Sequence, residues 1–503
     1  MKKLKFIIPI LALTLFSCSD FLDVNKSPDN PTGSQITPNL NLSAAETNSF
    51  RPQTTIMNRL GNFMMNNWGM NVNAFAVTFP QEYSLEIDNT FYSGIWDVTY
   101  RATADYSIII NSTAPNYENH KAIAKIMKSF HFQTLVDLYG DIPYFDAHKG
   151  IKEVTPKYDD DKLIYRDLVT QLEAAIQTID NPVANTIPVG AEDVILGGDM
   201  AGWKRMANTL KLRILLRQCR LTDAETVSYL TTKFASLSGA SFVASNVIIN
   251  PGYSNSNATL QNPFYAQMYD ANELTVRQEF NFVRASKYMG DLLNFPIDPR
   301  GARIFVLVGG TVKGVIQGDK SQSGNGTAPG LISSLGPGIV TSSKQDGYIM
   351  SLSESLFLQA EAVNRGYLTG SAQTLFNAGI AASFAQLSAG SAAAYTTAIN
   401  TGAGNIGRGY GNIGSTPNDQ IKAIMYQKNI ALQGVTNVME SFIDHTRTGV
   451  INSIPLAQFG ATTRPNKPRT MIYPNSEQVA NSANVPVRTL SSVFTTGPFW
   501  YVP

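Results

Sequence analysis

The segment from Asn119 to Gly150 places the tightest limit on what this chain can fold into. Its apolar residues recur at helical spacing and form two stripes, the first made of Ile123, Ile126, Met127, Phe130 and Leu138 and the second of Phe132, Leu135 and Val136. A helix with two apolar stripes has to be buried between two neighbours. We expect it to end near Tyr139, because Gly140 can adopt the left-handed conformation that closes a helix. The sequence therefore predicts that the rest of the chain packs around this helix.

Apolar periodicity predicts further helices that carry the core. Together with the helix near 121–138, they lie near 160–179, 203–217, 349–365 and 418–433, and a helix over 372–387 is expected to pack back on 349–365. The carboxylates of residues 159–161 suit a helix N-terminus. The cluster of Arg213, Arg217 and Arg220 suits a C-terminal dipole. Residues 309–347 hold ten glycines and almost no periodicity, which predicts a loop or short hairpin.

The N-terminus is typical of an exported lipoprotein. Residues 1–17 begin with lysines and continue in an apolar run that is too short to span a bilayer, as in a secretory signal peptide. Cys18 follows Leu15-Phe16-Ser17, which resembles a lipobox, so we expect Cys18 to carry acyl chains such as palmitate. The alternative is a plain signal peptide with an incidental cysteine. With Cys18 lipidated, Cys219 is the only thiol left and no intrachain disulfide can form.

Two segments hold about twice the usual share of aromatic residues. Residues 63–100 contain nine in 38 positions and residues 253–295 contain eight in 43, against 10% in the whole chain. Aromatic faces stack on sugar rings, but they also fill cores, so either role is open for each residue. The candidates for ligand binding are Trp68, Tyr83, Tyr265 and Tyr269. Asparagines 66, 67, 71 and 73 surround Trp68 and match the hydroxyls of a sugar, whereas Trp96 lies at helical spacing with Tyr92 and Tyr100 and is interpreted as structural.

The sequence argues against several functional classes. A net charge of +1 disfavours a nucleic-acid partner. No motif of a phosphate-binding loop, zinc hydrolase or serine hydrolase occurs, the four histidines are scattered, and we expect no cofactor or metal. Glu354 and Glu361 lie seven residues apart on one helix face, where they either perform acid–base chemistry or bond a neighbouring helix. The letters of a dinucleotide fingerprint at 402–407 lack the strand and helix that its mechanism needs.

An ordered set of short motifs resembles the SusD/RagB family of outer-membrane nutrient-binding lipoproteins. The set comprises Tyr139-Gly140-Asp141-Ile142-Pro143-Tyr144, Asp298-Pro299-Arg300, Ala360-Glu361-Ala362, Asp444 with Arg447 and Gly449, and Arg469 with Tyr473-Pro474, Glu477 and Asn481. The family commonly has a tryptophan and two arginines near 442–447, where this chain has Phe442 and His445. The order of the motifs, rather than any one of them, carries the resemblance. It is closest to the branch with looser glycan-binding loops.

The resemblance implies a fold, a location and a function. The expected fold is a mostly α-helical, tetratricopeptide-like scaffold of paired helices over 18–503, with a loop-rich insertion at about 250–347 that contributes to the ligand face. The expected protein is anchored by lipid to the outer membrane, faces the cell exterior and is not an enzyme. It is expected to bind an oligosaccharide, or alternatively a peptide, and to deliver it to a SusC-like TonB-dependent transporter. A lipid-anchored glycoside hydrolase and a helical-repeat adaptor are the other two hypotheses.

Overall fold

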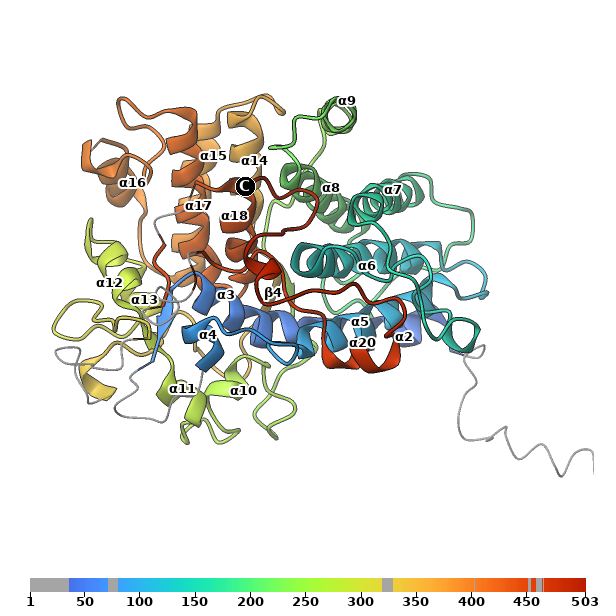
Figure 1. Ribbon diagram of the computed structural model, residues 1–503, viewed down its shortest axis with the longest axis horizontal. Helices are drawn as coiled ribbons and strands as arrows, with labels where there is room; N and C mark the ends of the chain where they lie inside the picture. The colour runs from blue at the N-terminus through green and yellow to red at the C-terminus, as the bar shows by residue number, and fades with distance from the viewer. Residues whose placement is uncertain are drawn as a thin grey trace, which may run out of the picture.

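The computed structural model describes residues 36–70, 80–318, 329–401, 403–450, 454–457, 464 and 466–503. The signal peptide predicted for residues 1–17 and the lipidation site predicted at Cys18 lie outside this part, as do Asn71 and Asn73. Helices predominate in the described part, and its strands are only two to four residues long. The prediction of a mostly α-helical fold is confirmed (Figure 1).

The scaffold consists of long helices that pack side by side. These are α2 (Pro38–Pro52), α5 (Gly94–Ile110), α6 (Glu118–Tyr139), α7 (Asp161–Asp180), α8 (Met200–Arg217), α9 (Ala224–Ala235), α14 (Leu352–Asn364), α15 (Ala372–Leu387), α17 (Pro417–Gln433) and α18 (Met439–Thr448). Figure 1 shows α5 to α8 on one side of the molecule and α14, α15, α17 and α18 on the other. This arrangement is the paired-helix scaffold that the family resemblance implied.

Shorter elements connect and cover the scaffold. The helices are α3 (Asn58–Met64), α4 (Pro80–Ser84), α10 (Tyr265–Met268), α11 (Gln278–Phe282), α12 (Lys287–Asn294), α13 (Gly301–Ile304), α16 (Ala393–Thr401) and α20 (Asn475–Ala480). Single helical turns are η1 (Gln53–Met57), η2 (Gly150–Lys152), η3 (Pro329–Leu331), η4 (Ala403–Asn405) and η5 (Ser492–Phe494). The turn η1 is a π-helix directly after Pro52, whose ring and missing N–H disturb the regular helical hydrogen bonds.

Helix α6 lies between α5 and α7, as its two apolar stripes predicted. Ile126 of the first stripe and Leu135 of the second are both completely buried. The helix ends at Tyr139, and Gly140 has a φ of 70° and donates its N–H to the carbonyl of Val136 at 2.8 Å. A residue with a side chain would be strained at this φ, so a glycine is suited to this position.

The other predicted helices are present, but the start of α14 and the role of the arginines in α8 differ from the prediction. The aspartate run caps α7, because the carboxylate of Asp160 accepts the N–H of Leu163 at 3.0 Å. Helix α14 begins at Leu352 instead of 349, since β4 (Gly347–Met350) pairs with β2 (Val247–Ile249). The interpretation of Arg213 and Arg217 as dipole partners is wrong, because both side chains are buried in ion pairs with other helices.

These two arginines belong to a buried ion network inside the scaffold. Its cations are Arg213, Arg217, Lys428 and Arg447, and its anions are Asp137, Glu354, Glu361, Glu440 and Asp444. The members come from α6, α8, α14, α17 and α18. Breaking one buried pair leaves an uncompensated charge, which typically costs about 3–5 kcal/mol. The network therefore disfavours other registers of these five helices.

One short sheet closes the base of the segment that the sequence predicted to be loop-rich, and a second ties this segment to the N-terminal part of the chain. Strands β2 and β4 are antiparallel neighbours, so the chain leaves the scaffold after Ile249 and returns at Gly347. Within this segment, β3 (Arg284–Ala285) pairs with β1 (Trp68–Gly69). Short helices α10 to α13 lie between these points, and Figure 1 places them along the lower left edge of the molecule.

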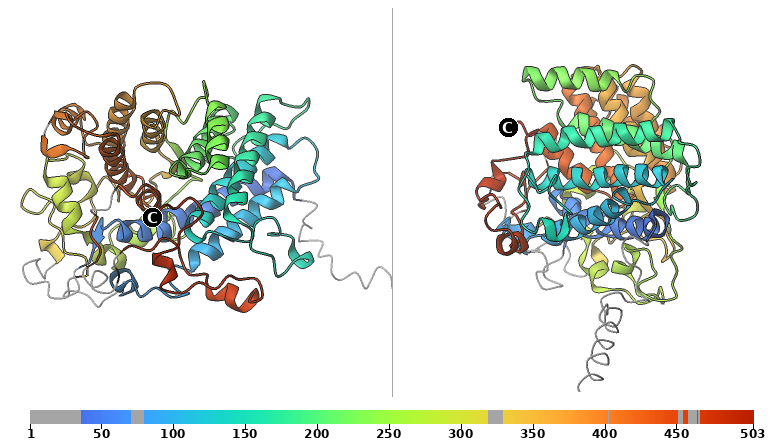
Figure 2. Two further views of the ribbon diagram at one scale, coloured as in Figure 1. Left: turned by 45° about the horizontal axis from the view of Figure 1, so that its top comes forward. Right: turned by 90° about the vertical axis from the view of Figure 1, so that its right-hand side faces the viewer.

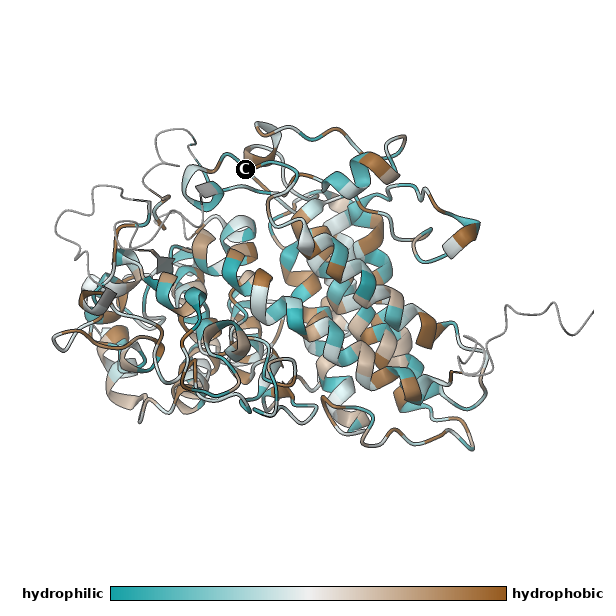
Figure 3. Ribbon diagram, turned by 90° about the horizontal axis from the view of Figure 1, so that it is seen from below, coloured by the Kyte–Doolittle hydropathy of each residue, from teal (hydrophilic) through white to brown (hydrophobic). Residues whose placement is uncertain are grey.

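The C-terminal segment crosses the scaffold and returns to its N-terminal helices. The N–H of Met471 donates to the carbonyl of Leu138 at 2.7 Å, and the hydroxyl of Ser476 donates to Asp97 at 3.2 Å. Figures 1 and 2 accordingly show the red helix α20 beside the blue helices. In the part that the structure describes, no helix is long and apolar enough to cross a bilayer. Figure 3 shows hydrophilic and hydrophobic residues alternating along the helices.

Candidate ligand-binding surface

Two of the four predicted ligand contacts, Trp68 and Tyr83, lie in the core. Their exposed fractions are 3% and 2%, and both rings pack edge-on against Phe63, with centroids 6.4 and 6.1 Å away. The two described asparagines beside Trp68 are engaged by the protein, since Asn66 donates to the carbonyl of Pro455 at 3.0 Å and Asn67 donates to Asn429 at 3.1 Å. As placed, neither ring offers a free face to a sugar, so these two residues are not carried into the functional proposal.

The other two, Tyr265 and Tyr269, belong to a surface structure that we call the aromatic hairpin, residues 265–282. The rings of Tyr265 and Tyr269 are stacked, with centroids 5.4 Å apart and planes at 20°. Phe280 adds a third ring, 5.2 Å from Tyr269. Tyr265 is 5% exposed, whereas Tyr269 and Phe280 are half-buried. The partly exposed rings of this stack are therefore Tyr269 and Phe280, and Tyr265 is buried beside Tyr269.

Local hydrogen bonds shape the tip of the aromatic hairpin. The carboxamide oxygen of Asn272 accepts the N–H groups of Leu274 and Thr275, both at 2.9 Å. This is an Asx-type turn, in which a side chain replaces a backbone acceptor. Next to the rings, Arg277 donates to Asp270 at 2.7 Å, and both side chains are about two-fifths exposed. The hairpin thus combines two partly exposed rings with charged hydrogen-bonding groups at the surface.

Two further contacts hold the aromatic hairpin, one at its base and one at its tip. Arg59 of α3 donates to Glu279 at 2.8 Å, and Glu273 accepts the N–H of Ser343 at 2.9 Å. Burial raises the pKa of Glu279, and Arg59 opposes this by stabilising the carboxylate. The hairpin is therefore tied both to the scaffold and to the returning end of the insertion.

The carboxylates that the sequence singled out for possible acid–base chemistry are structural. Glu354 pairs with Arg213 at 3.1 Å, and Glu361 pairs with Arg447 at 2.6 Å, with all four side chains buried. The interpretation that these glutamates bond neighbouring helices is confirmed. Among the described residues, no three histidine, cysteine, aspartate or glutamate side chains gather as a metal site would require. His131 is a core residue with an exposed fraction of 3%, and its burial and nearby Arg213 lower its pKa to about 3.

Solved structures with the same fold include several proteins of one family. A chitin-binding SusD homologue from Flavobacterium johnsoniae has a TM-score of 0.71 at 20% identity, covering 92% of this chain and 98% of its own. A protein described as chitin-binding has a TM-score of 0.69 at 23% identity, covering 89% of this chain and 95% of its own. A SusD homologue from Bacteroides fragilis has a TM-score of 0.70 at 17% identity, with coverage of 89% and 95%. At these identities the likeness shows the fold.

A match to a protein-family model assigns this chain to a family. No curated protein matches the sequence. The model of a SusD-like family, described as starch-binding and associating with the outer membrane, matches residues 29–474. This range includes most of the chain, the whole helical scaffold and the aromatic hairpin. The resemblance seen in the ordered motifs is thereby confirmed, and the chain belongs to the SusD-like family.

Proposed function

We propose that this protein binds an oligosaccharide at the cell surface and delivers it to a SusC-like TonB-dependent transporter, without breaking a bond in its ligand. The observation that carries the proposal is the aromatic hairpin, where Tyr269 and Phe280 present ring faces beside the Asp270–Arg277 pair. The family description and the chitin-binding neighbours support a saccharide as the ligand class. A peptide is the second candidate, and the test below separates the two.

The chemistry of the hairpin suits a pyranose ring. The C–H face of a sugar packs on an aromatic face, and Tyr265 limits the movement of Tyr269 because the two rings are stacked. Sugar hydroxyls donate to a carboxylate such as Asp270 and accept from a guanidinium such as Arg277. Each aromatic contact contributes about 1 kcal/mol, by analogy with aromatic pairs. Such moderate affinity allows the ligand to leave for the transporter.

Calorimetry tests the binding site. Chitin and starch hexasaccharides and a hexapeptide are titrated into wild-type protein and into the variants Tyr269→Ala and Phe280→Ala. Each variant is expected to weaken saccharide binding about fivefold, since about 1 kcal/mol is lost. Phe295→Ala is the matched control, because this ring is 76% exposed on another loop. Binding of the peptide alone, or equal saccharide affinity in all four proteins, would refute the proposal for this site.

The delivery step requires an anchor and a partner. We propose that Cys18 carries the lipid and that a barrel transporter binds the protein at the outer membrane. Metabolic labelling with a palmitate analogue is expected to mark the wild type and not Cys18→Ala, and equal labelling would exclude this cysteine. A mild-detergent pull-down is expected to recover a barrel protein. Recovery of the monomer alone, while other barrel–lipoprotein complexes survive, would contradict the partnership.

A further inference from the structure

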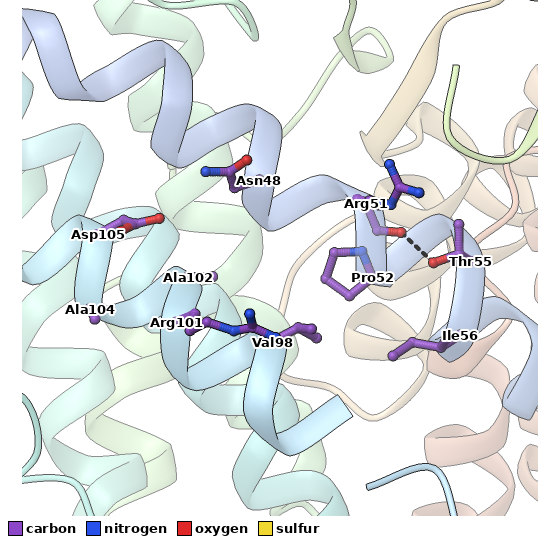
Figure 4. Close-up of a pocket in the computed structure, with 10 residues that line it drawn as sticks. All are labelled: Asn48, Arg51, Pro52, Thr55, Ile56, Val98, Arg101, Ala102, Ala104 and Asp105. Atoms are coloured by element: carbon purple, nitrogen blue, oxygen red, sulfur yellow. Dashed lines mark hydrogen bonds between the residues drawn. The ribbon is translucent and has the colours of Figure 1, made fainter. Parts of the chain in front are cut away.

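Two surface depressions meet on helix α5. The α2–α5 depression, of about 550 Å³, lies between α2, η1 and α5. Figure 4 shows Pro52 and Ile56 on one side of it and Val98 and Arg101 of α5 on the other. The α5–α20 depression, of about 460 Å³, lies between α5, the loop of residues 143–156 and α20. Arg101 and Ala104 line both depressions, so the two adjoin across this helix.

Ala104 has the smaller side chain of the two residues that line both depressions. Arg101, Ala104 and Ile108 follow one another on the same face of α5, at spacings of three and four residues. Arg101 and Ile108 have long side chains, and Ile108 is 52% exposed. Ala104 contributes only a methyl group between them. An extended ligand can therefore pass over α5 at Ala104 from one depression into the other.

The α5–α20 depression has a rigid, largely apolar floor. Tyr100 is half-buried, and its hydroxyl donates to the carbonyl of Pro143 at 2.7 Å. The ring of Trp96 supports Tyr100 at a centroid distance of 4.7 Å. His148 forms part of the wall and bonds Thr103 at 2.9 Å. Burial and nearby Lys128 lower the pKa of His148 to about 4, so this side chain is uncharged at neutral pH.

Polar groups line the edges of both depressions. At α20, Glu477 accepts the hydroxyl of Tyr158 at 2.8 Å with one oxygen, and Asp97 lies exposed on the facing helix. In the α2–α5 depression, burial raises the pKa of Asp105. In the described part of the chain, the terminal nitrogens of Arg101 have no hydrogen-bond partner, and only its Nε donates, weakly, to the carbonyl of Asp97 at 3.4 Å. The edges therefore offer both acceptors and a donor to a ligand.

We propose that the two depressions form one groove, the α5 groove, which binds an extended neutral oligosaccharide at a second site separate from the aromatic hairpin. Figure 1 places α20 and α5 to the right of α10 and α11 on the same lower side of the molecule. The ligand crosses α5 at Ala104, packs C–H faces on Tyr100 and Pro52, and hydrogen-bonds through its hydroxyls to Arg101 and the carboxylates. The choice of a saccharide rests on the proposed function.

The walls of the groove also favour a saccharide over a peptide. Extended peptides are commonly bound by pairing with the free edge of a sheet. The α5 groove is lined by helices and loops, and the backbone groups within a helix are already hydrogen-bonded to each other. A hydroxylated chain needs only side-chain partners and apolar faces, both of which this groove supplies.

Hydrogen exchange with a chitin or starch hexasaccharide tests the second site. In the variant Tyr269→Ala, in which the hairpin is weakened, saturating saccharide is expected to protect residues 143–156 and 475–480. Ala104→Trp places a bulky ring where the ligand crosses α5 and is expected to weaken this site at least about tenfold, which corresponds to about 1.4 kcal/mol. Ile108→Trp is the matched control, because it adds the same side chain one turn away, in neither depression. Arg101→Ala, expected to weaken the site about fivefold through a lost hydrogen bond, is the second variant if Ala104→Trp does not fold.

Each of the following four results would contradict the proposal of a binding site in the α5 groove. Protection confined to residues 265–282 removes the second site and leaves the proposed function intact. Protection of 143–156 that Ile108→Trp and Ala104→Trp reduce equally also contradicts a crossing at Ala104. Protection of the groove by a hexapeptide and by no saccharide refutes the ligand class. If no saccharide protects any segment of the wild type, both the groove and the proposed function fail.

Discussion

Residues 63–100 and 253–295 are equally rich in aromatic side chains, yet the fold places them in different environments. In the first region, Trp68 and Tyr83 pack on Phe63 and are almost fully buried. In the second, the buried ring of Tyr265 stacks on Tyr269, which is only half-buried. Aromatic density therefore does not distinguish a core from a binding surface. The neighbours of each ring decide its role.

The asparagines near Trp68 illustrate how misleading the local sequence is. They resemble the polar partners of a sugar, but Asn67 forms amide hydrogen bonds with Asn429, at 3.1 and 3.0 Å. Buried amides need partners, and here the partner lies 362 residues away along the chain. In the aromatic hairpin the polar partners are local, because Asp270 and Arg277 lie only seven residues apart and pair across the hairpin.

Among the variants that test this contrast, Trp68→Ala is expected to have the largest effect. Removing this buried ring is expected to cost about 3–5 kcal/mol of unfolding free energy, through lost burial and the cavity that remains. Denaturant unfolding measures the loss, and Phe295→Ala, whose ring is 76% exposed, serves as the control with little expected change. If Trp68→Ala left stability unchanged and abolished saccharide binding, Trp68 would be a ligand contact.

Features of the fold that depend on neighbouring residues could be predicted from the sequence, and contacts between distant segments could not. The two stripes of α6 and the capping by Asp160 depend on neighbours in sequence, so spacing alone predicted them. Arg217 was misassigned because its partners, Asp137 and Asp444, lie on two other helices. The pairing of β2 with β4 was missed for the same reason, since it joins short strands about 100 residues apart. Contacts between distant segments leave no periodic signal.

The same limit applies to the candidate binding sites. The stack of Tyr265 and Tyr269 could be predicted from the sequence, because the two residues lie four positions apart, at the start and the C-terminal cap of α10. The α5–α20 depression could not, since it needs α5, the loop after Pro143 and α20 together. Trp96 is interpreted as structural from its helical spacing with Tyr92 and Tyr100, and its exposed fraction of 3% agrees with that role. Tyr100 of the same series donates its hydroxyl to the carbonyl of Pro143. Its half-buried ring nevertheless lines the depression.

The next largest effect concerns the contact that ties the aromatic hairpin to α3. Arg59→Met removes the pair with Glu279 and leaves that carboxylate partly buried. Charged hydrogen bonds of this kind are worth about 2 kcal/mol, so the free energy of unfolding is expected to fall by that amount. Arg205→Met is the control, because its pair with Asp199 is more exposed and such pairs contribute about 0–1 kcal/mol. Equal losses in the two variants would show that the hairpin is not held by Arg59.

A smaller effect is expected at the surface stack itself. Tyr269→Ala removes a half-buried ring, so we expect a decrease in unfolding free energy of about 1 kcal/mol and a fivefold loss of saccharide affinity. Thermal unfolding and calorimetry on one preparation compare the two quantities. A loss of stability as large as that of Trp68→Ala, with unchanged affinity, would place Tyr269 in the same structural class as Trp68.

The smallest effect is a pH dependence at the base of the hairpin. Burial raises the pKa of Glu279 above its ordinary value of 4.5, although Arg59 lowers it in part. The folded protein then binds more protons than the unfolded chain between 4.5 and the folded pKa, so stability falls as the pH rises through this window. Glu279→Gln cannot ionise and lacks this dependence. The stability advantage of the wild type over Glu279→Gln is therefore expected to be greatest near pH 4 and to shrink towards neutral pH. Thermal unfolding of both proteins from pH 4 to 7 measures it. An advantage that grows with pH would mean that the ion pair with Arg59 outweighs the cost of burying the charge, and the hairpin would then be held most firmly at neutral pH.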